Sequence, residues 1–129
     1  MSGALAAMAE GARKSAAYVD DFIDHVMEAH GVSADKVALV GFSQGTMMSL
    51  QTAPRREKQI AGVVGFSGAL LGEAAFAADL KTRPPMLLVH GTADPVVPIE
   101  ASQLAKNTLA TNGIEVSLHE RAGLQHGID

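Results

Sequence analysis

The serine at position 43 stands between two glycines, in Gly41-Phe42-Ser43-Gln44-Gly45. The apolar run 36–40 before it predicts a buried strand, and the run 46–51 after it predicts the start of a helix. A glycine-flanked serine at such a turn is typical of a nucleophile elbow, whose strained backbone raises the hydroxyl above the sheet. We expect strand and helix to pass too close for a Cβ at either glycine. The backbone N–H of Gln44, at the helix N-terminus, is the candidate oxyanion donor.

Nucleophilic acyl transfer also needs a base that takes the serine proton and an acidic group that orients the base. Asp94 follows the apolar run 85–90, and His126 follows the run 116–120. Side chains beyond the carboxyl ends of parallel strands gather at one edge of a sheet. We therefore predict that His126 accepts the proton of Ser43 and that Asp94 orients the imidazole.

Each of these motifs also has an interpretation that involves no catalysis. A Gly-x-Ser-x-Gly string arises by chance in many proteins, Asp94 beside Pro95 fits a turn, and His126 fits a surface position in a glycine-bounded segment. The order serine, aspartate, histidine, each after a predicted strand, favours catalysis over coincidence. His90 ends a predicted strand next to Gly91, and we interpret it as a structural residue.

The rest of the chain alternates between predicted strands and helices. Strands are expected at 36–40, 60–66, 85–90 and 116–120, and helices at 3–30, 44–53, 72–80 and 99–112. This alternation indicates an α/β protein with a parallel sheet. The first three strands are apolar on both faces, as in strands covered by helices on both sides. In the first helix the predicted buried face comprises Val19, Phe22, Ile23, Val26 and Met27.

Composition narrows the class of function. A chain of 129 residues with 47% hydrophobic and 19% charged residues supports one globular domain. A net charge of −4 gives no reason to expect nucleic acid as a partner, and the lack of cysteine excludes a thiol nucleophile. The first ten residues show neither a leader nor an apolar span, so we expect a cytoplasmic protein without stable membrane insertion. Because no cluster has metal-ligand spacing and no glycine-rich loop fits a phosphate, we expect no metal and no cofactor.

With these residues in place, the chain resembles the phospholipase/carboxylesterase family of α/β-hydrolases. The matching motifs are Val40-Gly41-Phe42-Ser43-Gln44-Gly45, Gly65-Phe66-Ser67-Gly68, the segment 89–98 and His126-Gly127-Ile128. The resemblance implies hydrolysis of small-molecule or lipid carboxylic esters, or of thioesters, through an acyl-serine intermediate. It also implies that Ser43, Asp94 and His126 form the catalytic triad.

The resemblance further implies roles for neighbouring residues. Gln44 takes the oxyanion position after the nucleophile, and Phe66, Leu70 and Leu71 lie near the acyl pocket. The position before the histidine, often glycine in the family, is Gln125 here, which could alter the packing of the histidine loop.

Family members are longer than this chain. The resemblance implies that residues 1–129 form a single partial α/β-hydrolase domain, without the N-terminal strands, the loop with the second oxyanion donor and the final helix. Four parallel strands with helices mainly on one face would leave an apolar sheet face and a strand edge uncovered. We therefore expect a homo-oligomer formed through that face or edge.

Two other functions stay open at this point. The chain could be a catalytically impaired remnant that acts as an oligomerising or binding module. It could also perform another acyl transfer on the same scaffold, such as perhydrolysis.

Overall fold

The sheet of the protein contains four parallel strands. The computed structural model describes residues 3–71 and 73–129. Its strands are β1 (Ala38–Phe42), β2 (Gly62–Phe66), β3 (Met86–Gly91) and β4 (Val116–Arg121). They stand in the order β1-β2-β3-β4, so β1 and β4 are the edges of the described sheet. The predicted parallel α/β sheet is thus confirmed. β1 and β2 begin two residues later than expected, and Lys36, predicted to open the first strand, belongs to a 3-10 turn instead.

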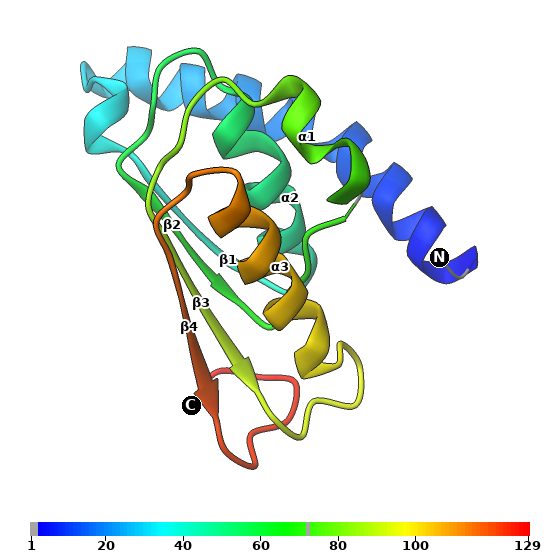
Figure 1. Cartoon of the computed structure of the whole chain (residues 1–129). Coiled ribbons are helices and arrows are strands. Elements are labelled where there is room, and N and C mark those ends of the chain that lie inside the picture. The colour runs from blue at the N-terminus through cyan, green and yellow to red at the C-terminus, as the bar shows by residue number, and fades with distance from the viewer. Residues whose placement is uncertain (1–2, 72) are drawn as a thin grey trace.

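Among the described residues, three α-helices accompany the sheet: α1 (Gly3–His30), α2 (Gln44–Thr52) and α3 (Ile99–Thr111). Figure 1 shows α1 crossing the top of the molecule, while α2 and α3 lie alongside the strands. The helix expected at 72–80 is a 3-10 helix over Glu73–Asp79, and Gly72 lies outside the described residues. Within residues 3–71 and 73–129, no helix combines the length and the apolar character needed to cross a membrane.

The main core lies between the sheet and one layer of helices. It contains Leu50 from α2, Leu109 from α3, and Val63 and Leu88 from the two central strands. Because side chains alternate along a strand, the neighbours of these strand residues point to the opposite face. That face is open: Val40 is 71% exposed and Leu87 is 40% exposed.

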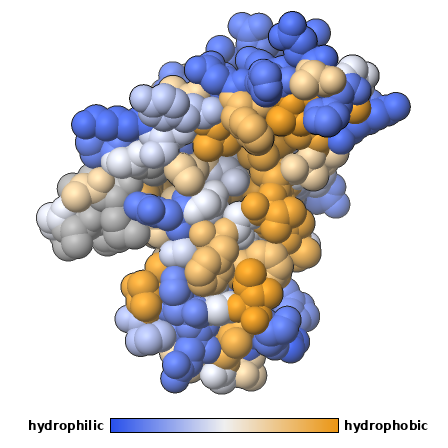
Figure 2. All heavy atoms as spheres, turned by 180° about the vertical axis from the view of Figure 1, so that it is seen from behind, coloured by the Kyte–Doolittle hydropathy of each residue, from blue (hydrophilic) through white to orange (hydrophobic). Residues whose placement is uncertain are grey.

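Helices therefore cover mainly one face, as expected for a partial hydrolase fold. The interpretation that helices cover the strands on both sides is wrong for this chain. The apolar pattern of the strands is nevertheless real. Figure 2 shows the molecule from behind, where hydrophobic atoms gather in a band down its middle.

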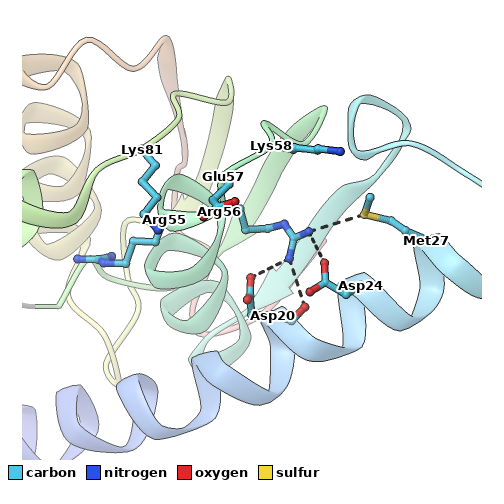
Figure 3. Close-up of a pocket in the computed structure, with 8 residues that line it drawn as sticks. All are labelled: Asp20, Asp24, Met27, Arg55, Arg56, Glu57, Lys58 and Lys81. Carbon is cyan, nitrogen blue, oxygen red and sulfur yellow. Dashed lines mark hydrogen bonds and ion pairs between the residues drawn. The ribbon is translucent and has the colours of Figure 1, made fainter.

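Helix α1 is fixed to the rest of the fold by its contact with α2 and by an ion-pair cluster. Arg56 donates from Nη1 to Oδ1 of Asp20 and from Nη2 to Oδ1 of Asp24, each at 2.7 Å (Figure 3). The Arg56 side chain is only 7% exposed, so two carboxylates compensate one buried cation. A cavity of about 400 Å³ beside this cluster is lined by residues of α1, by the segment after α2 and by Lys81. None of the three predicted catalytic residues lines it.

The prediction of which side chains of α1 are buried is only partly correct. Ile23 is buried and Met27 packs against the core, but Phe22 is 64% exposed. A helix that packs mainly against one other helix buries a narrow stripe, and Phe22 lies beside that stripe rather than in it.

Candidate active site

Ser43 occupies the turn between β1 and α2. Its φ of 54° is a left-handed value that a residue with a Cβ rarely adopts, as the predicted elbow requires. The backbone N–H of Ser43 donates to the carbonyl oxygen of Phe66 at 2.8 Å, which ties the turn to the end of β2. Helix α2 begins at Gln44, so the N–H groups of its first turn have no partner within the helix. The serine hydroxyl and the free N–H donors of the first turn of α2 thus lie next to each other.

The two glycines of the elbow differ in the space that surrounds them. A Cβ at Gly41 would lie 2.5 Å from the backbone nitrogen of Thr46, so strand and helix are as close there as predicted. A Cβ at Gly45 would meet no atom within 4 Å. The expectation that both flanks require glycine is therefore wrong at position 45. The crossing of β1 and α2 is tight only on the strand side, because position 45 already lies within the helix.

The three predicted catalytic side chains meet at the carboxyl ends of their strands. Nε2 of His126 lies 3.1 Å from Oγ of Ser43, and Nδ1 of His126 lies 2.7 Å from Oδ2 of Asp94. Since the carboxylate accepts the hydrogen on Nδ1, Nε2 of a neutral ring is free to accept the serine proton. The ring of Phe42 packs against the imidazole at a centroid distance of 4.9 Å.

Asp94 is held as a charged acceptor. Its side chain has no exposed surface, and its Oδ1 accepts from the N–H groups of Val96 at 2.8 Å and Val97 at 2.9 Å. Burial raises the pKa of the Asp94 carboxyl, but the hydrogen bonds from His126, Val97 and Val96 outweigh burial and leave this pKa below its ordinary value. The carboxylate is therefore ionised at neutral pH and can stabilise a charged imidazole.

Two residues of the site were missed by sequence reasoning. Thr46 is buried, its Oγ1 donates to the carbonyl oxygen of Phe66 at 2.9 Å, and a Cβ at Gly65 or Gly68 would lie 2.5 Å from its side chain. Ser67 has a φ of 52°, nearly the same as Ser43.

A sequence signal for this arrangement exists. The tripeptide Gly-Phe-Ser occurs at 41–43 and again at 65–67, and the two copies are register partners on β1 and β2, with Gly41 opposite Gly65. The repeat marks the point where each strand is followed by a serine with a left-handed φ.

The predicted pocket residues lie in different surroundings. Leu70 is part of the main core, while Leu71 packs in a second cluster with Met47 and Val97. Phe66 ends β2 and is half-buried. Their role in an acyl pocket stays a prediction. No group of three or more histidine, cysteine or acidic residues within 3–71 and 73–129 is arranged to hold a metal ion.

The chain is similar to known proteins in sequence and in fold. The model of the family described as phospholipase/carboxylesterase matches residues 4–129. Acyl-protein thioesterase 1 of Gibberella zeae is 30% identical over 122 residues, which cover 91% of this chain and 52% of that protein. Esterase YpfH of Escherichia coli is 32% identical over 99 residues, covering 77% of this chain and 41% of its own. The crystal structure of esterase PE8 superposes with a TM-score of 0.94 at 34% identity, covering 97% of this chain and 58% of that one. The chain thus spans about half the length of the curated relatives it matches.

Proposed function

Because this chain belongs to the phospholipase/carboxylesterase family, we propose that it is a serine hydrolase that cleaves carboxylic esters or thioesters. The observation that carries the proposal is the continuous contact from Asp94 through His126 to Ser43, at 2.7 Å and 3.1 Å. Three side chains from three separate turns meet in the order that nucleophilic acyl transfer requires. The known activities of the relatives, thioesterase and esterase, are of the same chemical class.

In the acylation step, Oγ of Ser43 attacks the acyl carbon while its proton passes to Nε2 of His126. The carbonyl oxygen becomes an oxyanion, which accepts a hydrogen bond from the N–H of Gln44. The intermediate then collapses: the bond to the leaving group breaks, His126 returns the proton to the departing alcohol or thiol, and an acyl-Ser43 ester forms. Asp94 holds the imidazole in position and stabilises its transient positive charge.

In the deacylation step, water takes the place of the leaving group. His126 accepts a proton from the water as its oxygen attacks the acyl carbon, and the same N–H stabilises the second oxyanion. Collapse breaks the acyl–Oγ bond, His126 returns the proton to Ser43, and a carboxylic acid leaves. Each cycle consumes one water and restores the starting protonation states.

For the substrate we propose a small-molecule or lipid ester or thioester, with the acyl chain near Phe66, Leu70 and Leu71. The apolar character of these three side chains supports an acyl group at that position. Leu70 and Leu71 are buried, whereas Phe66 is half-buried, so Phe66 is the one of the three that an acyl group reaches most directly. The cytoplasmic location expected from the sequence stays a prediction.

We also propose that the molecule self-associates through the uncovered face of the sheet. Val40 and Leu87 support this, because large apolar side chains on one open face favour burial against another surface. The free edge of β1 offers unpaired backbone groups next to the same face. A second copy always carries the same apolar face and the same edge, so we propose a second copy as the occupant.

A fluorophosphonate probe with mass mapping tests the enzymatic proposal. We expect the probe to bind covalently at Ser43, and the Ser43→Ala variant to lose the label. Ser117→Ala, which removes an exposed hydroxyl from β4, is the matched control and should keep the label. Absence of label on protein that melts cooperatively would contradict the proposal and favour a remnant with a binding role.

A further inference from the structure

We propose that His90, together with Ser102, is a positioning residue that sets the orientation of the Asp94 carboxylate. This inference rests on the proposed function, because it assigns a role within the same site. The sequence pattern indicates only a structural role for His90. Its contacts make it the inner anchor of the turn that presents Asp94 to His126.

The imidazole of His90 is fully buried and both of its nitrogens have partners. Nε2 lies 2.7 Å from the carbonyl oxygen of Val97, and Nδ1 lies 2.6 Å from Oγ of Ser102. A carbonyl oxygen only accepts, so Nε2 carries the hydrogen. In the neutral ring Nδ1 then accepts from the hydroxyl of Ser102. The two contacts therefore determine both the tautomer and the rotation of the ring.

Val97 links this imidazole to the candidate acid. Its carbonyl oxygen accepts from His90, and its own N–H donates to Oδ1 of Asp94 at 2.9 Å. Nε2 of His90 also lies 3.4 Å from Oδ2 of Asp94, the oxygen that meets Nδ1 of His126. The imidazole of His90 thus holds the turn in place, while the imidazole of His126 contacts the carboxylate of Asp94 that the turn carries.

The anchor of His90 lies in the core of the fold. Ser102 is a buried residue of α3, and its single hydroxyl hydrogen has two acceptors within reach: Nδ1 of His90 at 2.6 Å and, in a longer contact, the carbonyl oxygen of Gly68 at 3.3 Å. Ala105 and Leu109, further along the same helix, pack in the main core. Asp94 is therefore held in position through contacts with a helix that packs in the core, and not by an exposed loop alone. Because a displacement of about 1 Å in a reacting group can cost on the order of 100-fold in rate, such an anchor has a direct effect on turnover.

Two substitutions at position 90 separate the two contacts of the ring. The side-chain nitrogen of glutamine lies at the ε position and reaches the place of Nε2, whereas that of asparagine lies at the δ position and reaches the place of Nδ1. His90→Gln keeps the donor to Val97, and His90→Asn keeps only the contact with Ser102.

With an activated ester as substrate, we expect His90→Asn to lower kcat about 10- to 100-fold while KM stays within about twofold. His90→Gln should retain kcat within about fivefold of the wild type. Equal losses in the two variants, in proportion to their melting temperatures, would show a purely structural role and overturn the proposal.

The Asp94→Asn background provides a second test. If His90 acts through Asp94, adding His90→Asn to Asp94→Asn should change kcat by less than about twofold, whereas independent residues would give the full loss again. Additive losses would overturn the proposal.

A spectroscopic measurement separates this proposal from the proposed function. The proton on Nδ1 of His126 should give a low-field NMR signal, identified by its loss in His126→Ala. We expect this signal to persist in His90→Gln, which keeps the donor to Val97, and to broaden or vanish in His90→Asn, which loses that donor. If the wild type lacks turnover but its signal follows this pattern, the proposed function fails and the positioning role stands. A signal unchanged in His90→Asn would overturn the positioning role.

Discussion

The backbone nitrogen of Thr46 lies 2.5 Å from the point that a Cβ on Gly41 would occupy. The same threonine has a Cγ2 atom 2.5 Å from the corresponding point on Gly65. One residue of the first turn of α2 thus fills the space that two glycines on neighbouring strands leave open. This close contact lets α2 begin directly behind Ser43 and brings its N–H groups to the serine hydroxyl.

The two glycines of the elbow should respond oppositely to alanine. Gly41→Ala forces a Cβ into the backbone of α2, and we expect it to lower the free energy of unfolding by about 3 kcal/mol or more and to prevent probe labelling. Gly45→Ala meets open space within a helix and should be neutral or stabilising by up to about 1 kcal/mol. Urea unfolding of the two variants measures both effects, and a destabilised Gly45→Ala would contradict this account.

The lowered pKa of Asp94 predicts a stability difference that depends on pH. A carboxyl whose pKa is lower in the folded than in the unfolded state stabilises the fold above its unfolded pKa, and this contribution is lost as pH falls through the folded pKa. We expect the unfolding free energy of the wild type, minus that of Asp94→Asn, to be constant near neutrality. It should decrease below about pH 4. Urea unfolding at a series of pH values tests this, and a difference that grows on acidification would contradict it.

Substitutions in the ion-pair cluster around Arg56 should lower the free energy of unfolding non-additively. Asp24→Ala alone leaves Arg56 paired with Asp20, and because Asp24 is largely exposed we expect a cost below about 1 kcal/mol. Asp20→Ala combined with Asp24→Ala leaves a buried cation without either carboxylate and should cost about 3 kcal/mol. Adding Arg56→Met to this double variant should recover part of the loss, since methionine fills the space without a charge. Equal, additive costs in urea unfolding would argue against a shared partner.

Self-association through the sheet face predicts a mass above the 13.4 kDa of one chain in light scattering. Val40→Lys places a charge on the apolar face, next to the free edge of β1, and should shift the molecule to the monomer. Leu104→Lys is the matched control: Leu104 is also a large exposed apolar side chain, but it lies on α3, away from the open face, and its substitution should leave the mass unchanged. A monomeric wild type that melts cooperatively would contradict the proposal.

Local patterns in the amino-acid sequence were enough to predict the type and order of the main elements and the three side chains of the candidate triad. Those signals are local: a glycine-flanked serine after an apolar run, a strand followed by Asp94, and another followed by His126. Each depends on neighbours a few residues away, which a linear pattern records.

The residues that occupy the space around these three side chains could be identified from the folded chain alone. Ser43 and His126 are 83 positions apart, and their contact depends on the order of all four strands. The open space at Gly45, the exposure of Phe22 and the two hydrogen bonds of His90 likewise depend on segments distant in the chain. The pattern of residues within one segment does not say which distant segment it contacts. Such contacts are therefore seen only in the folded chain.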